Sequence, residues 1–237
     1  MSTAYLTIDD GPTKNTKQLL DFLLGKNIIP IMFFWGDRIK EARENGIYAI
    51  QHGAYIGNHT CTHPRFSSIP LEQCIKEIED QEAAINSLYE EAGVKREYKI
   101  FRFPYGDKGG DIGDEKRDAL QKYLASHGFC KPDYSLVTYD WYFEEKLDRD
   151  YDTFWTFDYE EYRLQYDSDF SYPMIMDRIA DPEPLQKGTL QDPKAHNIIL
   201  IHDHPQTDDI VPGYFYDIIH RTLDAGVTFL QPQFVTI

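Results

Sequence analysis

The chain alternates short apolar runs, rich in β-branched and aromatic residues, with longer segments in which apolar residues recur at helical spacing. This order is typical of repeated strand–helix units around a parallel sheet, and about seven units can be traced. Strands are expected at residues 5–8, 28–34, 55–57, 100–103, 136–139, 198–201 and 227–230. Helices are expected to begin near Thr16 and to cover residues 39–52, 71–92, 115–127 and 214–225. The sequence therefore predicts an α/β fold.

One stretch interrupts this alternation. Residues 141–191 are dense in Tyr, Phe, Asp and Glu and separate two of the expected strands. A connection of this length is expected to contain helices of its own and to form an insertion, not a second domain. The chain has 237 residues, of which 41% are apolar. Residues 1–237 are therefore expected to form a single domain.

The charge of the chain limits its partners. It has 40 acidic and 24 basic residues and a formal net charge of -16, which argues against a nucleic acid or an anionic membrane as partner. No apolar run reaches the roughly 20 residues of a membrane-spanning helix. Three sparse cysteines, and a strand pattern close to the first residue, predict a cytoplasmic protein. The sequence indicates no protein partner.

Two neighbouring acids end the first expected strand. Asp9 and Asp10 directly precede Gly11 and Pro12. Successive strand side chains point to opposite faces, but a Gly-Pro turn at the carboxyl end of a strand lets two adjacent carboxylates converge on one pocket. Barrel enzymes hold their catalytic groups at this end of the strands. Taken alone, such a pair more often does no more than open a turn.

Two histidines follow the third expected strand. His59 and His63 are four residues apart, and on one helical turn such side chains face the same way and can share a metal ion. With a carboxylate they would form a facial ligand set whose open positions take water and substrate. Two imidazoles and one carboxylate favour zinc, with cobalt or another divalent ion as alternatives.

An arginine ends the strand expected at residues 100–103. Arg102 precedes a rigid turn that contains Pro104 and Gly106. An arginine at this place can orient a catalytic carboxylate through a bidentate contact, and a backbone N–H of the turn can face a developing oxyanion. A purely structural arginine is an equally good interpretation.

A histidine leaves the apolar strand expected at residues 198–201. His202 is placed there for proton donation. An acidic partner would raise its basicity and fix its orientation, and Asp140 is the candidate. Asp203 and His204 are nearer in sequence, but a residue so close along the chain is expected to face elsewhere.

Taken in order, these elements resemble the polysaccharide deacetylase family, also called the NodB-homology or chitooligosaccharide deacetylase-like carbohydrate esterases. Residues 7–12, 59–63, 102–106, 140–141 and 200–202 are similar to the first to fifth motifs of the family. The resemblance spans residues 5–230. It implies a distorted (β/α)7 barrel of the glycoside hydrolase/deacetylase type. It also implies a metal-dependent hydrolase that removes N-linked acetyl groups from amino sugars of a poly- or oligosaccharide.

The resemblance further implies roles for the acidic and metal-binding side chains. Asp9 would be the general base, held in place by Arg102. The metal ligands would be Asp10, His59 and His63.

The remaining roles concern the substrate. His202, tuned by Asp140, would protonate the departing amine, and the Tyr105 backbone N–H would help to bind the oxyanion. The residues expected beside the substrate are Pro104, Trp141 and Leu200, with Trp35 and Trp155 as further candidates for a flat face against a sugar ring.

Two other functions stay open. The chain could hydrolyse another non-peptide C–N bond in a small cytoplasmic metabolite, which a comparison of N-acetylated oligosaccharides with small amides would reveal. It could also be a carbohydrate-binding protein that has lost turnover. The complete set of acid, base and metal-ligand residues speaks against the second alternative, because binding alone needs no acid/base pair.

Overall fold

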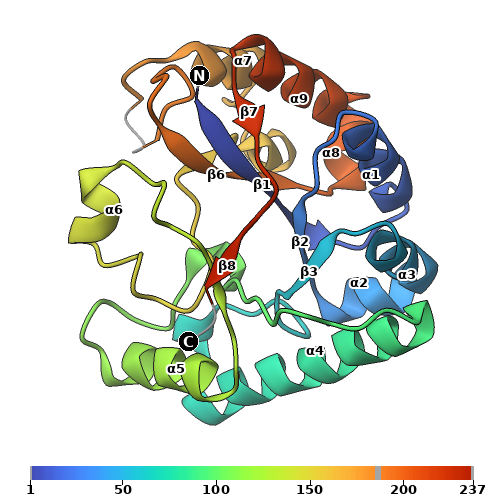
Figure 1. Cartoon of the computed structure of the whole chain (residues 1–237), viewed down its shortest axis with the longest axis vertical. Coiled ribbons are helices and arrows are strands. Elements are labelled where there is room, and N and C mark those ends of the chain that lie inside the picture. Colours follow the sequence, from blue (N-terminus) through green and yellow to red (C-terminus); the bar gives the residue numbers. More distant parts are fainter. Residues whose placement is uncertain (1, 185–187, 236–237) are drawn as a thin grey trace.

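A parallel sheet forms the centre of the computed structural model, which describes residues 2–184 and 188–235 (Figure 1). Its strands follow the order β3-β2-β1-β6-β5. They are β1 (Thr3–Gly11), β2 (Ile31–Phe34), β3 (Tyr55–Asn58), β5 (Phe157–Asp158) and β6 (His196–His202), with β7 (Thr228–Phe229) beside the start of β1. The β1–β6 ladder runs from the pair Thr3 and His196 to the pair Asp9 and His202.

The sheet continues beyond β3 through single parallel bridges. Asn58 pairs with Phe101, and Lys99 pairs with Phe129. These two segments and the five strands of the main path make seven parallel positions. A short antiparallel ribbon follows, formed by β4 (Lys131–Pro132) and β8 (Phe234–Val235). The predicted distorted (β/α)7 barrel is confirmed.

Helices surround the strands (Figure 1). They are α1 (Thr16–Leu24), α2 (Gly36–Glu41), α3 (Arg43–Gln51), α4 (Leu71–Ala92), α5 (Glu115–Ser126), α6 (Asp140–Glu144), α7 (Tyr172–Ala180), α8 (Pro205–Ile210) and α9 (Tyr214–Asp224), with 3-10 turns η1 (Phe66–Ser68), η2 (Pro104–Gly106) and η3 (Glu161–Gln165). In residues 2–184 and 188–235, no helix combines the length and the apolar character that a membrane crossing requires.

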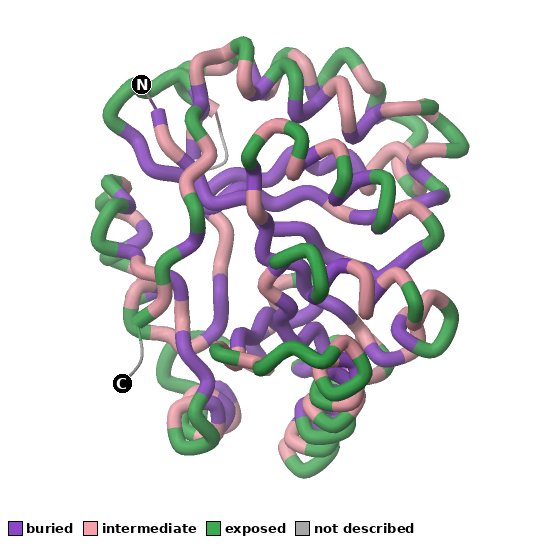
Figure 2. The backbone as a smooth tube through the Cα atoms, turned by 45° about the vertical axis from the view of Figure 1, so that its right-hand side comes forward, coloured by how far each residue is buried: buried purple, intermediate pink, exposed green. Residues whose placement is uncertain are grey.

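The core lies between the strands and these helices. The backbone of the central strands is buried, whereas the outer helices alternate between buried and exposed residues (Figure 2). Ile8, Phe34 and Ile201, from three adjacent strands, are fully buried, and each contributes about 1.5–3 kcal/mol through burial. β1, β2 and β6 are almost continuously buried because helices cover the sheet, as in other parallel sheets.

Two of the expected elements are wrong. The helix expected at residues 39–52 is divided into α2 and α3 at Ala42, whose φ of -130° and ψ of 41° are not helical. The strand expected at residues 136–139 does not form: Leu136 lies in a turn and is 45% exposed, and residues 137–139 have no regular secondary structure. On the side away from β1, β6 pairs with β5, which lies inside the expected insertion at 141–191. That segment is therefore part of the barrel, and it also contributes η3 and α7.

Candidate active site and metal centre

Asp9 and Asp10 reach the same cleft because the end of β1 is irregular. The register of β1 against β2 shifts between Ile8 and Gly11, and Asp10 has a φ of 66°. This left-handed conformation breaks the alternation of side chains across the strand. Both carboxylates line the cleft, so the convergence expected from the sequence is observed.

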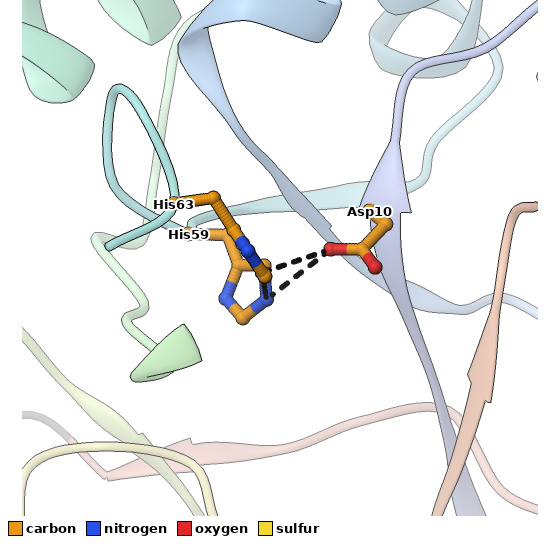
Figure 3. A group of neighbouring side chains, drawn as sticks. All are labelled: Asp10, His59 and His63. Carbon is orange, nitrogen blue, oxygen red and sulfur yellow. Dashed lines mark hydrogen bonds and ion pairs between the residues drawn. The ribbon is translucent and has the colours of Figure 1, made fainter. Parts of the chain in front are cut away.

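Asp10, His59 and His63 bring three potential metal-binding atoms together (Figure 3). Oδ1 of Asp10 lies 3.2 Å from Nε2 of His63 and 3.6 Å from Nε2 of His59. The two Nε2 atoms are 3.3 Å apart. Among the described residues, the buried Asp10 Oδ1 has no hydrogen-bond donor. A divalent cation would satisfy this oxygen together with both imidazoles, so the residues fit a metal ion.

The surroundings of His59 favour its neutral form and fix the orientation of its ring. Its Nδ1 lies 2.9 Å from the Arg102 carbonyl oxygen and donates to it, which leaves the lone pair of Nε2 directed at the other ligands. Burial lowers the pKa of His59 to about 4. The imidazole is therefore uncharged at neutral pH and need not lose a proton to bind a metal.

The surroundings of Asp10 favour its ionised form. Burial alone would raise the pKa of Asp10, but the adjoining imidazoles of His204 and His63 hold that pKa well below its usual range. Asp10 can therefore bind a cation across the whole neutral range.

The two histidines do not lie on a helical turn, which corrects the geometry expected from their spacing. They belong to a loop after β3 in which Thr60 has a φ of 67° and His63 a φ of 59°. Because both residues adopt the left-handed conformation, the loop folds back tightly enough to bring the two rings together. The four-residue spacing points to the right pair of histidines, but a loop and not a helix brings their rings together.

Side chains from β3 and α4 hold this loop in shape. Oδ1 of Asn58 accepts a hydrogen bond from the Thr60 N–H at 2.9 Å. The largely buried Glu77 of α4 accepts the N–H groups of Cys61 at 3.0 Å and Thr62 at 2.7 Å. Each backbone N–H is a strong donor, and one carboxylate of α4 binds two of them, so the conformation of the ligand loop depends on α4.

Arg102 contacts Asp9 as the resemblance implied. Its Nη1 lies 2.8 Å from Asp9 Oδ1 and 2.8 Å from the Thr7 hydroxyl, and its Nε donates to the Thr153 carbonyl at 2.8 Å. Arg102 and Asp9 are 1% and 3% exposed. The contact is a single hydrogen bond and not the expected bidentate pair, because within the described chain Nη2 has no acceptor.

His202 stands opposite Asp9 on the neighbouring strand. Its Nδ1 lies 2.8 Å from Oε1 of Glu161, a fully buried carboxylate in η3. Burial disfavours the charged imidazole, but the charge and hydrogen bond of Glu161, with smaller effects from Asp10 and Asp158, raise the pKa of His202 to about 10. The histidine therefore carries a proton at neutral pH.

Glu161, not Asp140, is the acidic partner of His202. Asp140 is exposed as the first residue of α6, a helix at the edge of the molecule (Figure 1). Glu161 follows β5, the strand that adjoins β6, so the fold brings its carboxylate to His202. Tyr162 packs edge-on against the His202 ring, with 5.2 Å between centroids. The acid–aromatic pair expected at Asp140 and Trp141 occurs instead at Glu161 and Tyr162.

Only some of the residues expected beside the substrate line the cleft. Leu200 lines the cleft, and so do Trp35 and Trp155. Trp141 packs between Tyr139 and Tyr142 in a separate apolar cluster. Pro104 is buried in η2. Neither Pro104 nor Trp141 lines the cleft.

His204 is a site residue that the sequence interpretation missed. Its Nε2 lies 2.6 Å from Asp10 Oδ2, and the Gln165 amide nitrogen lies 3.0 Å from its Nδ1. Since the amide N–H donates to Nδ1, Nε2 carries the hydrogen and donates to Asp10. His204 thereby orients the carboxylate ligand. The alternation of side chains along an extended segment would have placed it on the same face as His202.

The cleft around these residues has a volume of about 460 Å³ and is both polar and aromatic. Its lining consists of Asp9, Asp10, Trp35, Arg38, His59, His63, Arg65, Tyr105, Trp155, Asp158, Tyr162, Tyr166, Leu200, His202 and His204. A volume of this size suits a small organic ligand or one or two sugar rings.

Comparisons with known proteins identify the family. The profile of the polysaccharide deacetylase family matches residues 1–129. The peptidoglycan-N-acetylglucosamine deacetylase of Bacillus cereus is 24% identical over 95% of this chain and 72% of its own length. The putative polysaccharide deacetylase YheN of Bacillus subtilis is 25% identical over 96% of this chain and 66% of its own length.

A solved structure supports the same fold. The peptidoglycan deacetylase PdaC of Bacillus subtilis superposes with a TM-score of 0.61 and 22% identity, over 96% of this chain and 86% of that one. The family profile covers more than half of the sequence, and the ligand set and the barrel agree with it. This chain belongs to the polysaccharide deacetylase family.

Proposed function

We propose that the chain is an active, zinc-dependent deacetylase that removes an acetyl group from the nitrogen of an amino sugar in a poly- or oligosaccharide. One observation carries this proposal: Asp9 and His202 are paired residues of adjacent strands and lie beside the Asp10–His59–His63 set in one cleft. A carboxylate base and a protonated imidazole at a metal site are the groups that amide hydrolysis needs.

Asp10, His59 and His63 would hold the ion. Two imidazoles and one carboxylate with open positions are a catalytic zinc arrangement. A divalent ion bound there supplies a Lewis acid that polarises an amide carbonyl and lowers the pKa of water. His204 keeps the Asp10 carboxylate turned toward the two histidines.

Asp9 is placed to act as the base. Arg102 occupies its Oδ1, and its Oδ2 lies 3.6 Å from Nε2 of His59, beside the ligand set. The arginine therefore fixes the carboxylate with one oxygen directed into the cleft, where it can take a proton from the attacking water.

His202 is placed to act as the acid. Glu161 binds Nδ1, so Nε2 is left to face the cleft and to donate its proton to the departing amine. The negative charge of Glu161 keeps the ring protonated until the amine accepts that proton. The Tyr105 N–H stays a prediction for the oxyanion donor; Tyr105 lines the cleft with a φ of 60°.

The test of this proposal is acetate release, measured with added zinc and again after chelation. The panel contains N-acetylglucosamine oligomers, peptidoglycan fragments and O-acetylated xylan. We expect release from at least one N-acetylated member, with loss on chelation and recovery on return of zinc. No release from any member, by protein shown to contain stoichiometric zinc, would contradict the proposal and favour a small-molecule amide or a binding role.

Glu161→Gln should move the alkaline limb of the kcat–pH profile to lower pH. The carboxylate raises the pKa of His202, and the acid is active only while protonated, so a lower pKa means that activity is lost earlier as pH rises. We expect a shift of at least about one pH unit and a fall in kcat of about tenfold. Asp140→Asn is the matched control and should leave the limb in place. A shift in the control, with none in Glu161→Gln, would restore Asp140 as the partner.

A further inference from the structure

Two arginine–aromatic pairs flank the metal-ligand set. The rings of Trp35 and Tyr105 meet the His63 ring edge-on, with centroid distances of 4.8 and 4.7 Å. The guanidinium carbon of Arg38 lies 5.4 Å from the Trp35 ring, and that of Arg65 lies 4.1 Å from the Tyr105 ring. All four side chains line the cleft. Each of the two aromatic rings that contact His63 therefore has a guanidinium group beside it.

Both arginines retain hydrogen-bonding capacity, unlike Arg102. Arg65 is exposed, and over the described ranges no carboxylate lies within ion-pair distance of its guanidinium. Arg38 contacts Glu41 at 3.1 Å, but Glu41 is 65% exposed, and exposed pairs of this kind are weak. The Arg38 Nε is buried without an acceptor from the described residues. An anionic ligand could take these donors.

The other charges of the cleft do not account for these arginines. Asp9 is neutralised by Arg102, and Asp10 belongs to the ligand set. Asp158 is 6% exposed, and burial raises its pKa to about 7, which reduces its negative charge. The whole chain has a net charge of -16, so two arginines at the cleft, one of them paired with the exposed Glu41, are a local exception. A neutral sugar would need neither.

We propose that the preferred substrate carries an anionic substituent, a carboxylate or a phosphate, on or next to the N-acetylated sugar, and that Arg38 and Arg65 bind it. The guanidinium fork matches the oxygens of either group. Trp35 and Tyr105 supply the flat faces that the sugar ring contacts. This inference rests on the proposed deacetylase activity of the same cleft.

The first test compares charged and neutral members of matched substrate pairs. One pair is the disaccharide N-acetylglucosaminyl-N-acetylmuramic acid and its methyl ester. The other is the methyl glycoside of N-acetylglucosamine with and without a 6-phosphate. For at least one pair we expect kcat/KM to be about tenfold higher for the charged member at low ionic strength, with the advantage shrinking as salt is added. The pair that responds identifies the anion. Ratios near one for both pairs would overturn the inference.

Variants then assign the effect to the two arginines. Arg38→Gln and Arg65→Gln should each lower the charged-to-neutral ratio of kcat/KM about five- to tenfold. Arg149→Gln removes the same charge from an exposed position outside the cleft lining and should leave the ratio unchanged. An unchanged ratio in both cleft variants, or an equal fall in the control, would overturn the assignment.

A binding measurement separates this inference from the proposed activity. If no substrate releases acetate, the proposed function fails, and the inference is decided by titrating N-acetylmuramic acid and its methyl ester into zinc-loaded protein. Two of the three tryptophans line the cleft, so their fluorescence reports occupancy. Tighter binding of the acid, lost in Arg65→Gln, would support the anion site. Equal binding, or no binding of either compound, would refute it.

Discussion

Replacing Asp9 with Asn should reduce kcat for acetate release about 100- to 10,000-fold while the protein still binds one zinc ion per chain. The amide cannot take a proton from water, and general-base catalysis contributes a factor of this size. Metal content should persist because the ligands are Asp10, His59 and His63, and the substitution removes none of them. The measurements are steady-state acetate release and metal analysis after gel filtration.

The buried charge of Arg102 requires a control in this experiment. Asp9 and Arg102 are both almost fully buried, and removing one member of a buried ion pair can cost about 3–5 kcal/mol of stability. Thermal unfolding of Asp9→Asn, followed by circular dichroism, should therefore show a lower Tm with a cooperative transition that still lies well above the assay temperature. Activity close to that of the unmodified protein would exclude Asp9 as the base.

His59→Ala should lose metal and activity together. His59 is 2% exposed and supplies one of three ligand atoms. Substitution of residues that only support a ligand already weakens metal binding by about 10- to 100-fold, so loss of a ligand itself should cost at least about 100-fold. Zinc affinity is measured by competition with a chromophoric chelator, and kcat is measured at saturating zinc.

The matched control for this variant is His127→Ala. His127 is exposed at the end of α5 and should retain the affinity of the unmodified protein. In His59→Ala the carbonyl of Arg102 loses its donor, which adds a stability cost of about 1–3 kcal/mol, so unfolding must be recorded as well. A folded His59→Ala protein that kept full zinc affinity would show that the ligand assignment is wrong.

Some of this site was readable from the sequence because its residues follow strand ends. Asp9, Asp10 and His202 each stand where a clearly apolar strand meets polar residues, and parallel strands bring those ends to one edge of the sheet. His59 and His63 were found through their spacing, although a loop and not a helix unites them. These positions depend on local pattern and on the topology of the barrel, which the alternation of elements predicted.

The rest depends on contacts that local pattern does not reveal. β5 has two residues, too few to show a period, so the sequence does not reveal this strand and points to Asp140 instead of Glu161 as the partner of His202. Nearness to His202 argues against His204 as a site residue, whereas the alternation of side chains along an extended segment favours it. Arg38 and Arg65 belong to no motif. Arg38 lies in α2 and Arg65 in the loop after β3, and only the folded chain places both in the lining of one cleft.

Asp9 and His202, the proposed base and acid, are paired across the β1–β6 ladder, whereas the proposed sugar-binding residues lie elsewhere. Neighbouring strands are held about 4.8 Å apart by backbone hydrogen bonds, so the distance between proton acceptor and proton donor is set by the main chain. The side chains that we propose for contact with the sugar, among them Arg65, Tyr105 and Trp155, lie in connecting segments instead. Changes in those segments would therefore alter which carbohydrate fits the cleft without moving Asp9 relative to His202.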